Sequence, residues 1–141
     1  YDTLQEVIGI RPSPCSLAEY GVSYRQVDLL EKAVLLSRNH APDAENIPPL
    51  GEGWVAEEAL AIGVYAALAT SGAGTPQEHF RAAVALAVNH DGDSDSTGSI
   101  TGNIVGTLHG AAALPADWLQ ALEGREVIEE LARQFLKATT G

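Results

Sequence analysis

Residues 89–110 read NHDGDSDSTGSITGNIVGTLHG, and this segment organises the rest of the chain. Its first part, His90–Thr97, is predicted to be a short polar loop that carries three aspartates. Its second part, Gly98–His109, is predicted to be a helix of small residues. Glycine recurs every four residues through this second part, at Gly98, Gly102, Gly106 and Gly110.

The repeated glycines need a physical reason. A spacing of four residues places them on one helix face, and each glycine costs roughly 1 kcal/mol relative to alanine inside a helix. The close approach of another backbone would offset this cost, because glycine has no side chain to obstruct it. We therefore expect a tightly packed helix that holds an acidic loop at its N-terminus.

The aspartates of the loop are Asp91, Asp93 and Asp95, and hydroxyl residues follow them. Carboxylate and hydroxyl oxygens are the ligands that magnesium, manganese and calcium prefer. An EF-hand calcium loop beginning at Asp91 is excluded, because Ser96 stands where that loop needs glycine and Gly102 where it needs glutamate.

The same residues also have a purely structural interpretation. Serine, threonine and aspartate are the preferred N-cap residues, and acidic side chains are favoured at the positive end of a helix dipole. Ser96 or Thr97 would then cap the helix, and Asp93 and Asp95 would face water. The residue pattern alone leaves both interpretations open.

Two stretches resemble motifs of the ADP-ribosylglycohydrolases. One is Gly92–Gly98, GDSDSTG, with the glycines and the Leu108–Gly110 tripeptide that follow it. The other is Gly51–Leu60, GEGWVAEEAL, which precedes the first in the family's order and at about its spacing. The resemblance covers roughly residues 49–136. It implies an all-α fold, an orthogonal helical bundle, with residues 1–141 forming the C-terminal portion of one larger catalytic domain.

The resemblance implies a site with two divalent cations, Mg²⁺ or Mn²⁺. The metal ligands carried over from the family are Asp93, Asp95 and Ser96, and Asp95 is our choice for the carboxylate that bridges the two ions. The family more often has threonine where this chain has Ser96, so Thr97 is an alternative source of the hydroxyl.

The tryptophan stretch implies a substrate-binding loop. Gly51, Gly53 and Trp54 are expected to approach the adenosine part of ADP-ribose, as family loops of this kind line the substrate cleft. The structural alternative is that the glycines form a turn and Trp54 packs in the core, since aromatic residues more often serve packing.

The implied activity is hydrolysis of the glycosidic bond between ADP-ribose and a modified acceptor side chain. The substrate would be an ADP-ribosylated protein or a small ADP-ribose derivative. The catalytic residue is unassigned, because the general base is expected in an N-terminal half that this chain lacks. A catalytically inactive relative that binds ADP-ribose or metal, or a structural helical domain, is the alternative. The absence of methionine and the start at Tyr1 led us to expect a processed or excised chain.

Composition narrows the function classes. Nineteen acidic residues against eight basic ones give a net charge of −11, which disfavours nucleic-acid binding and docking to an anionic membrane. No apolar run approaches the roughly 18 residues of a membrane span. The single cysteine, Cys15, cannot form an internal disulfide, so we expect a reducing, cytoplasmic location.

Apolar spacing and turn residues predict the remaining helices. Tyr1–Ile10 is predicted to be the end of a helix. Further helices are predicted at Tyr24–Arg38, Trp54–Thr70, Pro76–Val88, Pro115–Leu122 and Arg125–Lys137. In the predicted helix Pro115–Leu122, we expect Trp118, Leu119 and Leu122 to face inwards. No strand is predicted, because no period-two pattern is sustained anywhere.

The sequence gives only weak predictions for the roles of the histidines. His109 is placed at a helix C-terminus, where a cation is favoured by the dipole. His90 is expected to be a partly exposed loop residue, with a hydrogen bond to a metal ligand as the alternative. His40 and His79 have no partner that the sequence identifies.

Overall fold

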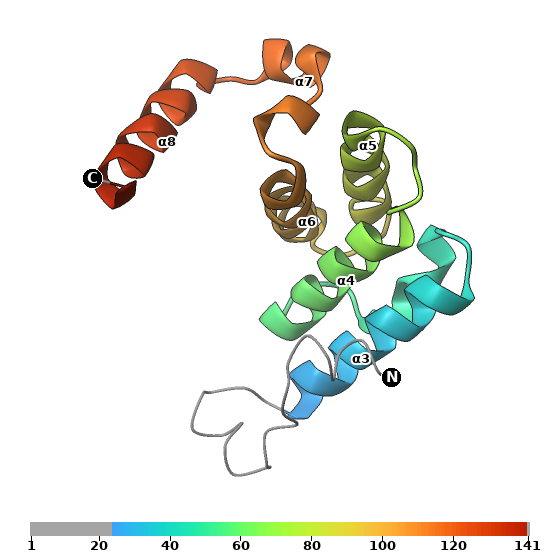
Figure 1. The fold of residues 1–141 in the computed structure, drawn as a ribbon. Helices are drawn as coiled ribbons and strands as arrows, with labels where there is room; N and C mark the ends of the chain where they lie inside the picture. Colours follow the sequence, from blue (N-terminus) through green and yellow to red (C-terminus); the bar gives the residue numbers. More distant parts are fainter. Residues whose placement is uncertain (1–23, 141) are drawn as a thin grey trace.

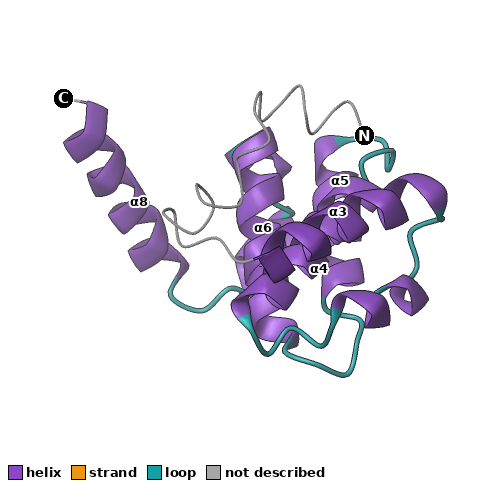
Figure 2. Cartoon of the chain, turned by 90° about the horizontal axis from the view of Figure 1, so that it is seen from below, coloured by secondary structure: helices purple, strands orange, loops and turns teal. Residues whose placement is uncertain are grey.

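The computed structural model describes residues 24–140, and within that range the chain is helical and has no β-strand (Figures 1 and 2). The α-helices are α3 (Tyr24–Asn39), α4 (Ala56–Ala69), α5 (Pro76–Ala87), α6 (Ser94–His109), α7 (Ala116–Ala121) and α8 (Arg125–Thr140). Short 3-10 turns lie at Ala44–Asn46, Pro48–Leu50 and Ala111–Ala113. The predicted all-α class is confirmed. The predicted helical segment Tyr1–Ile10 and the loop cysteine Cys15 lie outside the described residues.

The helix α4 is the centre of the fold and packs against α3, α5 and α6 (Figure 1). Its sequence AEEALAIGVYAALA is apolar on nearly every face after the two glutamates. Seven of its residues are buried: Ala59, Ala61, Ile62, Gly63, Tyr65, Ala66 and Ala67. A helix that is hydrophobic all round is expected in the interior, so the apolar sequence of the predicted helix Trp54–Thr70 also predicts its burial, and the structure confirms it.

One core cluster joins α4 to α3 and to the 3-10 turns before α4. It comprises Ala33, Ile47, Leu50, Ala61, Ile62 and Tyr65. The Tyr65 hydroxyl is buried there, donates to the Asp43 carbonyl oxygen at 3.0 Å and accepts from the Asn46 amide at 3.0 Å. These bonds satisfy a buried polar group and fix the chain that leads into the Gly51–Trp54 loop.

A second cluster joins α4 to α5 and α6 through Phe80 and explains the glycine face of α6. A methyl group at Gly102 or Gly106 would lie 3.9 Å or 3.8 Å from the Phe80 ring, and one at Gly98 only 2.8 Å from a Val88 methyl. Only Gly98 is required by a close neighbour, since a methyl group at Gly102 or Gly106 would meet the Phe80 ring at ordinary van der Waals distance. The expectation of a close backbone approach at these glycines was wrong, because among the described residues only side chains of Val88 and Phe80 come near them.

The start of α6 also differs from the prediction. The helix begins at Ser94, four residues before the predicted Gly98, and the Thr97 N–H donates to the Asp93 carbonyl at 3.2 Å as its first helical bond. Serine and threonine suggested a loop because they favour turns and caps. Here their hydroxyls bond to carbonyl groups of the preceding residues, which removes the cost of placing them in a helix.

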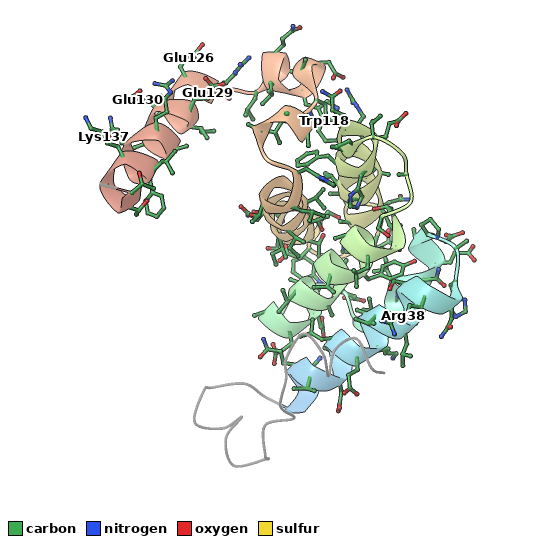
Figure 3. All side chains as sticks on the ribbon, in the orientation of Figure 1. Arg38, Trp118, Glu126, Glu129, Glu130 and Lys137 are labelled. Atoms are coloured by element: carbon green, nitrogen blue, oxygen red, sulfur yellow. The ribbon has the colours of Figure 1, made fainter. Side chains whose placement is uncertain are left out.

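The C-terminal helices are more exposed than their apolar patterns suggested. In α7, Trp118 is 39% exposed and Leu122, just after the helix, is 47% exposed, so the expectation that both face inwards was wrong. Trp118 lies at the surface of α5, where its ring meets Phe80 edge-on at 6.2 Å and Arg81 lies 5.0 Å from its centre (Figure 3). The pairing with Arg81 keeps the indole at the rim of the core.

The helix α8 lies apart from the body of the molecule in both orientations (Figures 1 and 2). Its large apolar residues, Val127, Ile128, Leu131, Phe135 and Leu136, are each between 53% and 72% exposed. Its charged residues pair with one another, as Arg125 does with Glu129. None of the described helices combines the length and the hydropathy needed to cross a bilayer.

The two phenylalanines of the chain provide a matched test of this core. Phe80 is 8% exposed and Phe135 is 72% exposed. Phe80→Ala is expected to lower the free energy of unfolding by about 3–5 kcal/mol, because it empties the space between α5 and the glycine face of α6. Phe135→Ala is expected to change it by less than about 0.5 kcal/mol. Urea denaturation followed by circular dichroism measures both, and equal effects would contradict the assignment of the core.

Candidate functional site

The site is built where the Gly51–Trp54 loop meets the loop before α6. The Asp93 N–H donates to the Glu52 carbonyl oxygen at 2.8 Å. This contact requires glycine at position 92, because a methyl group there would lie 1.8 Å from the same carbonyl oxygen. The two stretches singled out in the sequence are therefore in direct backbone contact.

The glycines of the first loop have structural reasons of their own. Gly51 and Gly53 have φ angles of +111° and +83°, which favour glycine. A methyl group at Gly51 would overlap the Glu58 carboxyl group, and one at Gly53 would lie 3.0 Å from the Thr97 methyl carbon. The predicted turn is confirmed, and it lets the loop lie directly on the first turn of α6.

The first turn of α6 is hydrogen-bonded to the end of α5. The Thr97 hydroxyl donates to the Ala87 carbonyl at 2.7 Å, and the Ser94 hydroxyl lies 3.1 Å from the Val88 carbonyl. The last carbonyls of a helix have no partner within it, so these two side chains supply the missing donors. Thr97 is fully buried. Its hydroxyl is thus already engaged, which favours Ser96 over Thr97 as a hydroxyl available to a ligand.

His90 holds the aspartate loop in shape. Its Nδ1 accepts from the Gly92 N–H at 3.0 Å, so the proton of the neutral ring lies on Nε2. Nε2 then donates to the Thr97 hydroxyl at 3.1 Å. His90 therefore links the loop before α6 to its first turn, and its intermediate burial agrees with the partly exposed loop residue that we expected.

Asp93, Asp95 and Ser96 lie together at the N-terminus of α6. Asp93 occupies the N-cap position of α6. Hydrogen bonding with the Asp95 carboxyl, and then with the Ser96 hydroxyl, holds the pKa of Asp93 below its ordinary value. Three side-chain oxygen donors thus share one small region.

These residues are partly accessible to solvent. Asp93 and Ser96 are half-buried and Asp95 is exposed. An open depression of about 300 Å³ runs along the C-terminal half of α6, from Gly102 to Leu114, and the aspartates do not line it. The acidic region is therefore a surface formed by two loops.

Trp54 ends the loop that contacts the aspartate loop through the Glu52 carbonyl. It is 66% exposed, so the alternative that it packs in the core was wrong. The indole N–H donates to the Glu52 carboxylate at 3.1 Å. An aromatic face is therefore presented to solvent two residues after the Glu52 carbonyl that holds Asp93.

His79, for which the sequence identified no partner, pairs with His109 away from the acidic loop. His79 is buried, and its Nδ1 lies 2.8 Å from Nε2 of His109 at the end of α6. Its Nε2 lies 2.8 Å from the Ala67 carbonyl oxygen, which can only accept, so Nε2 carries the proton. His109 is the donor to Nδ1. The pair connects α4, α5 and α6, and both rings are remote in sequence from the acidic loop.

Comparison with known proteins identifies the family. The family model described as ADP-ribosylglycohydrolase matches residues 2–141. The chain belongs to the ADP-ribosylglycohydrolase family. The "ADP-ribosylarginine hydrolase Tri1" of Serratia proteamaculans (strain 568) is 40% identical over 58 residues, which are 41% of this chain. The matched stretch is 16% of that relative's length. No solved structure matches the chain.

Membership of the ADP-ribosylglycohydrolases agrees with the all-α fold and with the motifs on which the resemblance rested. The structure brings the tryptophan loop and the aspartate loop together, as a shared site requires. Within residues 24–140, however, no group of three His, Cys, Asp or Glu residues is placed to hold a metal ion.

Sequence reasoning missed the residues that support the site. The Glu58 carboxylate pairs with Arg25 of α3 and accepts from the Glu52 N–H at 3.2 Å, and nothing in the sequence indicated either contact. Glu52 itself was unremarked between two glycines. The Gly51-Glu52-Gly53 sequence could have indicated the role of Glu52, because two glycines allow a turn with positive φ that exposes the backbone groups of its middle residue.

The contact between the two loops can be tested at Gly92. Gly92→Ala is expected to separate the Asp93 N–H from the Glu52 carbonyl and to destabilise the fold by about 1–3 kcal/mol. Gly72→Ala is the matched control, because a methyl group there meets nothing within 4 Å. Urea denaturation gives the stability change, and amide hydrogen exchange of Asp93 reports the bond. Unchanged exchange in Gly92→Ala would contradict the contact.

The hydrogen bonds around Asp93 can be tested by titration. Asp95→Ala and Ser96→Ala each remove a group that lowers the pKa of Asp93, so each is expected to raise that pKa toward 3.8. Carbon-13 NMR of the Asp93 carboxyl measures the midpoint in the wild type and in both variants. The larger rise is expected for Asp95→Ala. Three identical midpoints would exclude this arrangement of the side chains.

Proposed function

We propose that this chain is part of a metal-dependent ADP-ribosylglycohydrolase that hydrolyses the bond between ADP-ribose and a modified acceptor side chain. The observation that carries the proposal is the backbone contact of Glu52 with Asp93, which joins the loop of the exposed Trp54 to the segment that holds Asp93, Asp95 and Ser96. Family membership supports the chemistry, and the Asp93–Glu52 backbone contact supports a shared site.

The donor set suits a hard divalent cation. All three side chains offer oxygen, which Mg²⁺ and Mn²⁺ prefer. The Asp93 carboxyl group interacts with the Asp95 carboxyl and the Ser96 hydroxyl, which lowers its pKa, so these three side chains would be near enough to one another to hold one cation. Two carboxylates and one hydroxyl leave ligand positions open, which water, substrate or residues outside the described range would fill.

The roles of the residues follow from this arrangement. A bound Mg²⁺ or Mn²⁺ supplies Lewis-acid polarisation of ribose hydroxyls and of water. Asp93, Asp95 and Ser96 hold their oxygens at one place because α6 is hydrogen-bonded to α5 through Ser94 and Thr97. The exposed face of Trp54 can stack on a planar group such as a nucleobase. The turn at Gly51 and Gly53 lets a ligand approach the backbone closely.

Hydrolysis breaks the bond between the ribose carbon and the acceptor atom. Water provides the hydroxyl group that the ribose carbon gains, and its proton goes to the released acceptor. We assign no general base within residues 24–140 and propose that an N-terminal half of the domain supplies it. We further propose arginine as the acceptor, on the strength of the relative's name, "ADP-ribosylarginine hydrolase Tri1".

A second candidate function is an inactive relative that binds ADP-ribose or metal. It is favoured by the finding that no group of three His, Cys, Asp or Glu residues within residues 24–140 is placed to hold a metal ion. Both candidates need the oxygens of Asp93 and Asp95 for cation binding. Only the hydrolase also releases ADP-ribose from an ADP-ribosylated arginine, so product formation separates the two.

The metal assignment is tested with charge-neutral variants of the aspartates. Asp93→Asn and Asp95→Asn are each expected to weaken Mn²⁺ binding more than about tenfold, because each removes an anionic ligand. Asp91→Asn removes the same charge from an exposed position in the same loop and is expected to change the affinity less than about threefold. Isothermal calorimetry with Mn²⁺ gives the affinities. Equal affinity in all four proteins refutes the assignment.

A further inference from the structure

Glu52 is the residue through which the two loops of the site are connected. Its carbonyl accepts from the Asp93 N–H at 2.8 Å, and its own N–H donates to the Glu58 carboxylate at 3.2 Å. Its carboxylate accepts from the Trp54 indole at 3.1 Å. All three polar groups of one residue are thus used, each toward a different element of the site.

The backbone of Glu52 is fixed on both sides. The Glu58 carboxylate that receives its N–H is only 14% exposed and is paired with Arg25 of α3. On the other side, the Glu52 carbonyl is in tight contact with Gly92, where no side chain fits. The Glu52 side chain therefore starts from a position set by α3, α4 and the aspartate loop together.

The Glu52 side chain orients the Trp54 indole through a hydrogen bond. The indole is 66% exposed and has little packing to hold it, so its orientation depends on the hydrogen bond of its single N–H group. That bond goes to a carboxylate anchored beside Asp93. A stacking face is useful for recognition only if it is held still, because immobilising a side chain on binding costs affinity.

We propose that Glu52 is a positioning residue that orients the Trp54 indole relative to the aspartates, so that a planar base and a metal-bound ribose of one ligand are held together. This inference rests on the proposed function for the identity of the ligand. The orienting bond itself is a property of the free protein. Glu52 acts through Trp54 and needs no contact with the ligand.

The test uses the full 141-residue chain with Trp118→Phe, which leaves Trp54 as its only tryptophan. Glu52→Ala removes the acceptor, Glu52→Gln keeps an acceptor oxygen but loses the charge, and Glu45→Ala removes an equal charge from an exposed site in the 3-10 turn. Time-resolved fluorescence anisotropy measures local rotation of the indole without any ligand. Faster rotation is expected in Glu52→Ala alone, and slow rotation in the other three proteins.

Ligand affinity provides the second readout. With ADP-ribose as the probe, Glu52→Ala is expected to bind about three- to tenfold more weakly than its parent, the size of one lost hydrogen bond. Glu52→Gln is expected to stay within about twofold, and Mn²⁺ affinity is expected to stay within about twofold throughout. Rescue by glutamine separates an acceptor role from a charge effect or a folding defect.

The outcomes for the two proposals are distinct. Equal indole rotation in all variants, or a glutamine variant that behaves like alanine, overturns the positioning role of Glu52. A parent chain that binds neither ADP-ribose nor Mn²⁺ overturns the proposed function, whereas slow rotation that is lost only in Glu52→Ala still supports the orienting bond.

Discussion

The arrangement of the site depends on one backbone hydrogen bond, from the Asp93 N–H to the Glu52 carbonyl oxygen. It joins residues that are 41 positions apart and belong to loops at the N-terminal ends of α4 and α6. The bond is possible only because position 92 has no side chain. An acidic turn and an aromatic turn, each unremarkable alone, become one surface through this contact. Families that reuse a fold for new chemistry change such surfaces while the helices beneath stay the same.

The polar residues of the aspartate segment divide into two sets by their position around the first turn of α6. Ser94 and Thr97 turn toward α5 and satisfy its last carbonyls. The Asp93 carboxyl interacts instead with Asp95 and Ser96, which lowers its pKa. Capping and ligation were treated as rival interpretations of this sequence, but they do not exclude each other, because the residues that bond to α5 differ from those proposed as ligands. The structural role of the inward hydroxyls is what holds the carboxyl groups in place.

Much of the fold followed from the sequence because the helices of the body have strong local signals. Thr75 and Pro76 mark the start of α5, and a capping box with Glu78 is present there. The composition of α4 predicted its burial. The start of α6 was misplaced because the hydroxyl partners lie in another helix, which no local pattern contains. Other features also depend on distant contacts that a local pattern does not contain. These are the exposure of Trp54, the hydrogen bonds of Glu52 and the bonding of Glu58 to Arg25.

The helix α8 has a consequence for the behaviour of the chain in solution. It carries three acidic and three basic residues, so it is electrically neutral, and the whole excess charge of −11 resides on the remaining residues. Long-range repulsion therefore comes from the body, whereas the apolar side chains of α8 provide short-range attraction. Salt shortens the range of the first, from about 30 Å at 0.01 M to about 3 Å at 1 M, and leaves the second intact. Colloidal stability should accordingly be greatest in dilute buffer and decline as electrolyte is added.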